Sequence, residues 1–267
     1  MLKADLHIHS IVSDGSDSIE EIICTAEKKG LDALAITDHD TISHFSKIPY
    51  SAAVQVVPGI EISAVDRNGR RAHILGYCME RPELVGKFTQ STLDARNRNS
   101  ERQVQILLEH GFRIDAAKLA RADEKYLYKQ HIMDWLVSTG QVEEMFGCFY
   151  QSIFKNNGIC HFDIEYPDVF AAVDAVKAAG GLAVLAHSGQ QQNFDLIPAL
   201  TQHGLDGLEL NHHANNMQDM NMIRESAEKY GLFLTGGSDY HGKYEPQPFG
   251  IGDFISEESG VNAICRR

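Results

Sequence analysis

Histidine and carboxylate side chains recur in this sequence within or shortly after short apolar runs. The residues of this kind are His7, His9, Asp14, His39, Glu61, His73, His187, His212, Asp239 and His241. Imidazole and carboxylate groups together suit Zn²⁺, Fe²⁺ or Mn²⁺, and the absence of cysteine from the set argues against a structural zinc–thiolate site. The set therefore indicates metal-dependent chemistry, and its size favours more than one ion.

The spacing of two pairs has a direct physical meaning. Residues i and i+2 point to the same side of an extended strand, so His7 and His9 can reach one cation together. Asp239 and His241 can do the same if the chain stays extended there. A single H-x-H motif is a weak signal, because buried histidines also serve as hydrogen-bonding core residues. The metal prediction rests instead on the joint placement of such residues along successive predicted strands.

Apolar runs separated by amphipathic stretches are the elements that could position these side chains. The predicted strands are 2–6, 33–37, 54–63, 72–77, 182–186, 207–210 and 232–235. The predicted helices between them are 18–29, which opens on a capping-box pattern, 167–179 and 217–230. This alternation implies a mainly parallel α/β sheet, and the number of strands favours barrel-like closure. Active sites of such barrels lie at the C-terminal ends of the strands, where we expect every strand to present its ligand.

One segment interrupts the alternation and reads as a helical insertion after the fourth strand. Its predicted helices are 83–109, 115–122, 127–139 and 142–156. We therefore divide the chain into a barrel of residues 1–80 and 163–267 and a helical lobe of residues 81–162. Arg96, Arg98 and Arg102 recur in the lobe at helical spacing. They form either a solvated helix face or a basic lid over an anionic substrate.

The composition excludes several classes of partner. The net charge is −13, which makes the chain a poor electrostatic partner for duplex DNA or an anionic membrane. No stretch approaches the roughly 20 apolar residues of a membrane span. The cysteines are scattered without a C-x-x-C pair, which is typical of reduced thiols. We expect a cytoplasmic protein with a small substrate.

The motifs in combination resemble those of the polymerase and histidinol phosphatase (PHP) family. The matching segments are Asp5-Leu-His7-Ile-His9-Ser10, Ser13-Asp14-Gly15, Thr37-Asp38-His39-Asp40, Gly59-Ile-Glu61, His73, Ala186-His187 and Gly237-Ser-Asp239-Tyr-His241. The similarity covers roughly 1–80 and 165–245, and within the family it is strongest to stand-alone phosphoesterases acting on nucleoside 3′,5′-bisphosphates and short oligonucleotides. The resemblance implies a distorted (β/α)₇ barrel with an inserted all-helical lobe and a site for two or three divalent ions (Mn²⁺, Zn²⁺ or Fe²⁺).

The resemblance also implies a distribution of ligands. The first metal would take His7, His9, Glu61 and Asp239. The second would share Glu61 and add His73 and His187, and the third would take Asp14, His39 and His241. This chain departs from many relatives at Asp14, where they have histidine, and at Ser188, where they have proline. A carboxylate at position 14 favours a harder third ion.

The implied reaction is hydrolysis of phosphomonoesters of small nucleotides by a metal-bridged hydroxide. Glu61, Asp239 and His241 would form the catalytic set, with His241, the third metal or a lobe residue assisting the leaving group. The expected substrate contacts are Arg96, Lys129, His131, Ser188 and His212. Bisphosphate-specific relatives often have arginine just before the lobe histidine, whereas this chain reads Lys129-Gln130-His131. Lysine can neutralise phosphate but cannot hold it bidentately.

Three other functions remain as alternatives. A histidinol-phosphate or sugar-type phosphatase would use the same barrel with a different lobe. An amidohydrolase also begins with H-x-H but usually needs a metal-bridging lysine at a strand end, and no predicted strand ends in lysine. A non-catalytic metal-binding or polymerase-accessory fold would fit an eroded ligand set better than this complete one.

Several neighbouring residues are expected to have structural roles. Asp38 and Asp40 should cap or shape the turn around His39, and Asp5 should either orient a ligand or stabilise the strand end. Off-pattern histidines expected at the surface or in the lobe are His44, His110, His161 and His203. Tyr126, Tyr128 and Phe149 should pack in the lobe, with base stacking as the alternative.

Overall fold

The computed structural model describes residues 2–49, 53–119, 126–244 and 249–266. It contains one seven-stranded sheet whose strands follow chain order. The strands are β1 (Ala4–Ile8), β2 (Ala33–Ile36), β3 (Gln55–Val65), β4 (Arg71–Tyr77), β5 (Leu182–Leu185), β6 (Gly207–Asn211) and β7 (Phe233–Gly236). All seven predicted strands are therefore confirmed, and with them an α/β barrel-like fold.

The sheet curves until its two edge strands nearly meet. An isolated parallel bridge joins Ile8 to Tyr240, just beyond β7. The amide of His9 donates to the carbonyl of Tyr240 at 2.9 Å, and the amide of Asp239 donates to the carbonyl of His7 at 2.8 Å. The barrel is thus nearly closed at the end where the candidate ligands lie.

Strand direction is parallel except at β4, which is antiparallel to both β3 and β5. The expectation that every strand presents its ligand at the C-terminal end is therefore wrong for His73, which is the third residue of β4. Because β4 runs in reverse, its beginning lies beside the C-terminal ends of the other strands. His73 consequently reaches the same rim of the barrel.

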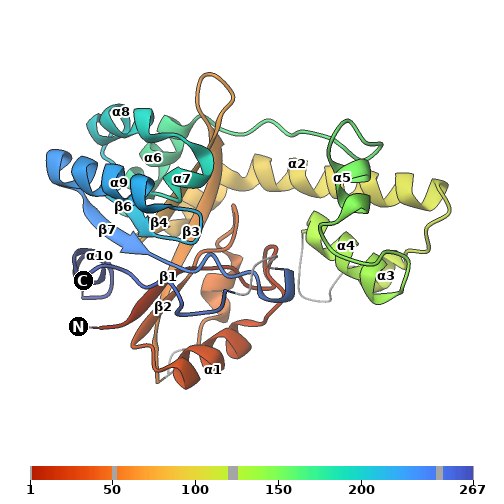
Figure 1. The fold of residues 1–267 in the computed structure, drawn as a ribbon, viewed down its shortest axis with the longest axis horizontal. Coiled ribbons are helices and arrows are strands. Elements are labelled where there is room, and N and C mark those ends of the chain that lie inside the picture. Colours follow the sequence, from red (N-terminus) through yellow and green to blue (C-terminus); the bar gives the residue numbers. More distant parts are fainter. Residues whose placement is uncertain (1, 50–52, 120–125, 245–248, 267) are drawn as a thin grey trace.

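Helices cover the outside of the barrel, as the α/β pattern requires (Figure 1). They are α1 (Ile19–Lys29), α6 (Val169–Ala178), α7 (Ser188–Gln191), α8 (Ile197–Gln202), α9 (Met217–Tyr230) and α10 (Glu258–Ile264), with short 3-10 helices η1 (Ser43–Lys47), η2 (Phe194–Leu196) and η3 (Gly242–Tyr244). The predicted capping box of α1 is present, because the Ser18 side chain accepts from the Glu21 amide and the Glu21 side chain accepts from the Ser18 amide. Gly30 ends the helix in the left-handed conformation.

An irregularity in β1 turns its ligands toward the barrel interior. Leu6 packs in a core cluster with Leu75 and Tyr77 from across the barrel, whereas Ile8 packs in the cluster that includes α1. The β1–β2 register shifts between Asp5 and Ile8. Such a bulge breaks the alternation of side chains along the strand, so His7 can face the barrel interior on the same side as its neighbour Leu6.

The remaining helices form a lobe beside the barrel (Figure 1). They are α2 (Pro82–Glu109), α3 (Ala116–Leu119), α4 (Lys129–Ser138) and α5 (Cys148–Phe154). Most of their buried apolar side chains make a separate core that includes Leu107, Leu136 and Phe154, whereas Val85 near the start of α2 packs in a core cluster of the barrel. The last residues of the predicted helix 115–122 lie outside the described residues. The predicted helix 142–156 is shorter, since it begins only after Gly147.

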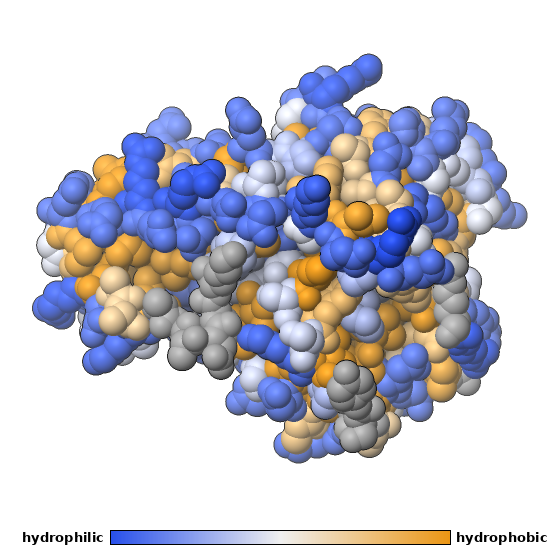
Figure 2. All heavy atoms as spheres, turned by 180° about the vertical axis from the view of Figure 1, so that it is seen from behind, coloured by the Kyte–Doolittle hydropathy of each residue, from blue (hydrophilic) through white to orange (hydrophobic). Residues whose placement is uncertain are grey.

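Polar side chains cover much of the face shown in Figure 2, over both the lobe and the barrel. Within the described parts of the chain, no helix combines the length and the apolar character required to cross a membrane.

Candidate metal centre

Four side chains from three parts of the barrel converge on one point. His7 lies in β1, His9 directly after it, Glu61 in β3 and Asp239 after β7. The Nε2 atom of His7 lies 3.3 Å from both Glu61 Oε2 and Asp239 Oδ1. The Nε2 atom of His9 lies 3.1 Å and 3.0 Å from the same two oxygens. One ligand atom from each residue thus faces a common centre, which matches the first predicted ligand set.

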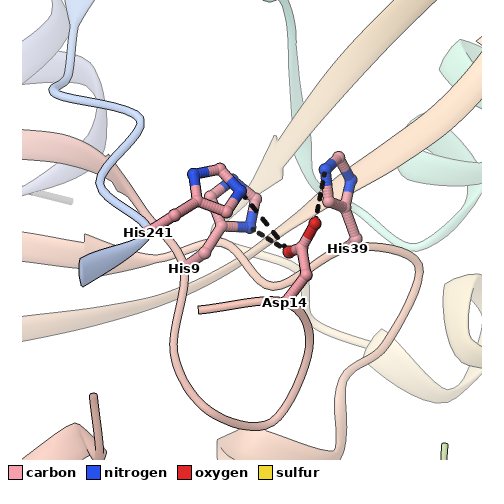
Figure 3. Close-up of side chains that lie close together, drawn as sticks. All are labelled: His9, Asp14, His39 and His241. Carbon is pink, nitrogen blue, oxygen red and sulfur yellow. Dashed lines mark ion pairs between the residues drawn. The ribbon is translucent and has the colours of Figure 1, made fainter. Parts of the chain in front are cut away.

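A second group surrounds Asp14 (Figure 3). Asp14 Oδ1 lies 3.4 Å from His241 Nε2 and 3.7 Å from His9 Nδ1, and Asp14 Oδ2 lies 3.9 Å from His39 Nε2. These four residues could together hold a cation. His9 therefore belongs to two groups, with one ring nitrogen facing each.

The other oxygen of Glu61 gathers a third group. Glu61 Oε1 lies 2.7 Å from His73 Nδ1 and 2.9 Å from His187 Nε2. Glu61 Oε2 lies 3.2 Å from His39 Nδ1, and His39, Glu61 and His73 could hold a further cation. Glu61 thus lies between the groups, in the position that the resemblance implies for a bridging ligand.

The first group has the chemistry of a cation site. Four ligand atoms are buried and have no hydrogen-bond partner among the described residues, namely His7 Nε2, His9 Nε2, Glu61 Oε2 and Asp239 Oδ1. Burying such atoms without a partner costs several kcal/mol in total, about 1–3 kcal/mol each. A divalent ion would satisfy all four at once, so the residues present fit a metal. The three groups together are consistent with a multinuclear metal site.

The pKa values of the site residues are shifted because buried carboxylates and histidines lie close together. Burial acts to raise the pKa of Glu61, but the surrounding histidines, His39 first among them, hold that pKa well below the usual range. Burial acts to lower the pKa of His9, but the Asp239 and Glu61 carboxylates raise it to about 10. Burial dominates at His39 and lowers its pKa to about 4. The carboxylates therefore remain ionised and attract positive charge.

Unusual backbone conformations place several of these residues. Asp40, His187 and Asp239 have φ values of 57°, 26° and 51°, in or near the left-handed region that non-glycine residues rarely adopt. The chain is therefore not extended at Asp239, so the condition under which Asp239 and His241 would reach one cation together is not met. The turn at Asp239 sends its carboxylate toward His9 and the His241 ring toward Asp14. Gly237 permits this turn, since a Cβ there would overlap the side chain of His7.

Asp38 supports the loop that carries Asp14. Its carboxylate accepts from the Ser10 amide and the Ser13 hydroxyl, both at 2.7 Å. On the other side it lies 3.2 Å from Nδ1 of His44, whose side chain is fully buried. The structural role expected for Asp38 agrees with these contacts, but a surface or lobe position is wrong for His44. That ring fills a space between β2 and β3, with Nε2 3.1 Å from the Ile36 carbonyl and 3.0 Å from the Gly59 carbonyl.

Several polar contacts between described residues join the lobe to the rim. Tyr128 donates its hydroxyl to the His39 carbonyl at 3.0 Å, and Gln130 donates to Asp14 Oδ2 at 2.9 Å. Arg96 forms an ion pair with Asp40 at 2.7 Å. Gln130 was not predicted as a site residue, because an amide on a helix has no distinctive sequence signal.

A cationic pocket lies where the lobe meets the rim. It has a volume of about 180 Å³, and its basic lining includes Arg71, Arg96, Lys129 and Lys155. Burial, reinforced by the three neighbouring cations, lowers the pKa of Lys129 to about 8. Four cationic side chains thus line the pocket beside one acidic lining residue, Asp163, and this excess of positive charge favours an anion.

The predicted substrate-contact residues occupy different places. Arg96 and Lys129 line the cationic pocket. His212 Nε2 lies 3.4 Å from Asp239 Oδ2, and Ser188 is buried at the start of α7, just after His187. His131 is buried in the lobe, where its Nδ1 accepts from the Tyr128 amide at 3.3 Å, and it does not line the pocket.

Sequence reasoning missed Glu209, in β6. Its carboxylate lies 2.9 Å from Nδ1 of His7 and accepts from the His187 amide at 2.8 Å. The available signal was a lone acidic residue between two leucines of the predicted strand 207–210.

Comparison with known proteins places the chain in a family. Residues 5–213 match the PHP domain model. The chain is 44% identical over 253 residues to a phosphoribosyl 1,2-cyclic phosphate 1,2-diphosphodiesterase of Eggerthella lenta, covering 91% of this chain and 96% of the relative. It is 27% identical to a 3′,5′-nucleoside bisphosphate phosphatase of Chromobacterium violaceum, covering all of this chain and 95% of the relative.

The fold comparison agrees. A crystal structure of a protein assigned as a metal-dependent phosphoesterase, from Bifidobacterium adolescentis, superposes with a TM-score of 0.86 at 29% identity, covering 98% of this chain and 96% of that one. The fold, the histidine–carboxylate groups and the domain match lead to one conclusion: this chain belongs to the PHP family of metal-dependent phosphoesterases.

Proposed function

We propose that this enzyme hydrolyses a phosphate ester on a small ribose-type substrate that carries a second phosphate, with a phosphoribosyl 1,2-cyclic phosphate as the first candidate. The observation that carries the proposal is the pairing of a metal-competent rim with a cationic pocket beside it. Arg96 belongs to the pocket and donates to Ser63 at 3.1 Å, and the Ser63 hydroxyl in turn lies 3.5 Å from Nδ1 of His39. The Eggerthella lenta relative supports the ribosyl phosphate class.

The ligand set proposed for two or three ions is the one outlined from the sequence: His7, His9, Asp14, His39, Glu61, His73, His187, Asp239 and His241. Divalent ions there, with Mn²⁺, Zn²⁺ or Fe²⁺ as the candidates, would activate a water molecule and neutralise charge on the phosphoryl oxygens. The reaction adds the water oxygen to phosphorus and breaks one phosphorus–oxygen ester bond. The departing ribose oxygen takes up a proton.

The exposure of the ligands indicates the side from which substrate enters. The side chains of His7 and His9 are fully buried, whereas those of His39, His73 and His241 are 13%, 16% and 16% exposed. The substrate phosphate would therefore meet the histidines that line the open side. The His241 ring is oriented by the contact of its Nδ1 with the Asp239 carbonyl at 2.7 Å. In the two-ion form of the site, where His241 binds no metal, this orientation makes the ring our candidate for delivering the proton to the departing oxygen.

The cationic pocket would hold the phosphate that does not react. Lys129 and Arg96 would contact it directly, which gives two of the predicted substrate contacts a specific role. Charge-assisted hydrogen bonds of this kind contribute about 1.5–3 kcal/mol each. The lobe would thus select substrates that carry a second phosphate, and the barrel would determine which ester bond is hydrolysed.

A nucleoside 3′,5′-bisphosphate is the second candidate, because aromatic side chains also line the pocket. Tyr128, Tyr150, Phe162 and Tyr166 contribute to its wall, and a nucleobase could stack on one of them. The Chromobacterium violaceum relative acts on this class.

Phosphorus-31 NMR separates the candidates. The purified enzyme, analysed for bound metal and then supplied with Mn²⁺, is incubated with a phosphoribosyl 1,2-cyclic phosphate, adenosine 3′,5′-bisphosphate, adenosine 5′-monophosphate or histidinol phosphate. We expect the highest kcat/KM for the cyclic phosphate. Preference for the bisphosphate would select the second candidate, and preference for a substrate with one phosphate would contradict the two-phosphate proposal.

A further inference from the structure

Glu209 is a buried carboxylate that belongs to none of the metal-competent groups in the described chain. It lies in β6 between Leu208 and Leu210 and is 1% exposed. Burying an ionised carboxylate is costly unless it is paired and hydrogen-bonded. The contacts that offset this cost show what the residue does.

One carboxylate oxygen determines the orientation of His7. Glu209 Oε1 lies 2.9 Å from His7 Nδ1, and an ionised carboxylate can only accept a hydrogen bond. In the neutral ring, which is the form that binds a metal, the single proton is therefore held on Nδ1. This leaves Nε2 bare, and Nε2 is the atom that faces Glu61 and Asp239 at 3.3 Å. A histidine ligand oriented in this way presents its lone pair to a cation.

The other oxygen holds the backbone of His187. Glu209 Oε2 accepts from the His187 amide at 2.8 Å. His187 has φ 26° and ψ 56°, a conformation that the local chain does not favour. This hydrogen bond helps to keep its ring against Glu61, where Nε2 lies 2.9 Å from Oε1.

We propose that Glu209 is a positioning residue that holds two candidate metal ligands at once, the ring of His7 on β1 and the backbone of His187 after β5. One carboxylate thereby sets the separation of ligands on opposite sides of Glu61. This inference rests on the metal centre of the proposed function, and it adds a residue that acts through the ligands without touching the ion.

The variant Glu209→Gln tests this role with almost no change in shape. The His187 amide can only donate, so the glutamine oxygen should remain with it and the NH₂ group should face His7 Nδ1. The ring must then accept at Nδ1, which moves its proton to Nε2, the metal-facing atom. We expect Zn²⁺ or Mn²⁺ affinity, measured by isothermal titration or chelator competition, to fall about 10–100-fold. Glu209→Asp should recover part of the loss.

The matched control is Asp219→Asn, which removes another buried carboxylate, at the start of α9. It should leave metal affinity unchanged. If Asp219→Asn weakens metal binding as much as Glu209→Gln, the effect is one of charge or stability and the positioning role is wrong. Wild-type affinity in Glu209→Gln would also overturn it, while leaving the metal centre intact.

The protonation of His7 can also be measured directly in the wild-type protein, so this test does not depend on whether a variant folds. Nitrogen-15 NMR of the Zn²⁺-loaded enzyme should show the His7 ring with its proton on Nδ1. A proton on Nε2 in a protein that binds metal tightly would overturn the inference alone. Failure of the wild-type enzyme to bind any divalent ion would overturn both this inference and the proposed function.

Discussion

The barrel rim around Glu61 and the lobe pocket around Lys129 have opposite electrostatic arrangements. At the rim, buried carboxylates face histidines, and several of their ligand atoms have no hydrogen-bond partner in the described part of the chain. In the pocket, Arg71, Arg96, Lys129 and Lys155 gather around little acid, and among the described lining residues only Asp163 is acidic. The rim is thus built to take up cations and the pocket to take up an anion.

This difference explains how a chain with a net charge of −13 can act on a phosphorylated substrate. Bound divalent ions would reverse the sign of the rim, and the lobe supplies fixed positive charge of its own. We infer that the rim performs chemistry on one phosphate and that the pocket recognises another. The predictions below separate the two regions.

The largest effect should come from removing a ligand that serves two groups. His9→Ala removes ring nitrogens that face both the Glu61 centre and Asp14. We expect kcat/KM to fall by at least about 1,000-fold, because activated water and charge neutralisation are lost together. The change is measured by phosphate-ester hydrolysis, and circular dichroism checks folding. His110→Ala, at the exposed end of α2, should behave as wild type. Full activity of a folded His9→Ala variant would exclude this site.

Removing a cation from the pocket should affect recognition more than chemistry. Lys129→Ala should raise KM for a substrate with two phosphates by about 10–100-fold, the equivalent of one lost charge-assisted hydrogen bond. The kcat for p-nitrophenyl phosphate, which has one phosphate, should change little. Lys118→Ala, at an exposed site of the lobe, is the control. Equal losses on both substrates would contradict the division of roles.

The pKa of Lys129 predicts a pH dependence confined to the pocket. Since burial lowers this pKa to about 8, the ammonium loses its charge as pH rises through that value. We expect KM for the two-phosphate substrate to rise several-fold between about pH 7 and pH 9. Lys129→Arg should flatten this rise, because arginine stays protonated. An identical pH profile in both proteins would show that another group titrates.

The smallest effect should come from loosening the contact between lobe and rim. Tyr128→Phe removes the hydrogen bond from the buried hydroxyl to the His39 carbonyl. We expect the free energy of unfolding, from urea denaturation, to fall by about 1 kcal/mol. Tyr230→Phe, at the end of α9, should change it less. A larger loss for Tyr230→Phe would indicate that the lobe contact contributes little.

Local pattern was sufficient for most of the fold. Alternating apolar runs and helix caps depend on neighbours within a few residues, and this is why all seven strands and the capping box before α1 could be predicted. Prediction was weaker in the lobe, where α5 begins only after Gly147. A short helix that packs on a small core is determined by its tertiary neighbours more than by its own sequence.

The candidate ligands could be named from the sequence because their residue types are distinctive and follow strands. Their supports could not, because they depend on contacts between distant segments. Glu209 and His7 are separated by 202 residues, and Gln130 and Asp14 by 116. The residue type of Gln130 does not mark it as part of a site, and the position of Glu209 between two leucines does not identify the residues that it contacts.

The sequence by itself determined the order of elements, the seven strands and the residue types delivered to the rim, because each depends on short-range pattern. Only the tertiary structure decided that β4 runs in reverse and brings His73 to the rim. It also decided that Asp239 lies in a left-handed turn and that four cations meet at one pocket. These features follow from how distant strands and helices pack, and no local spacing encodes that.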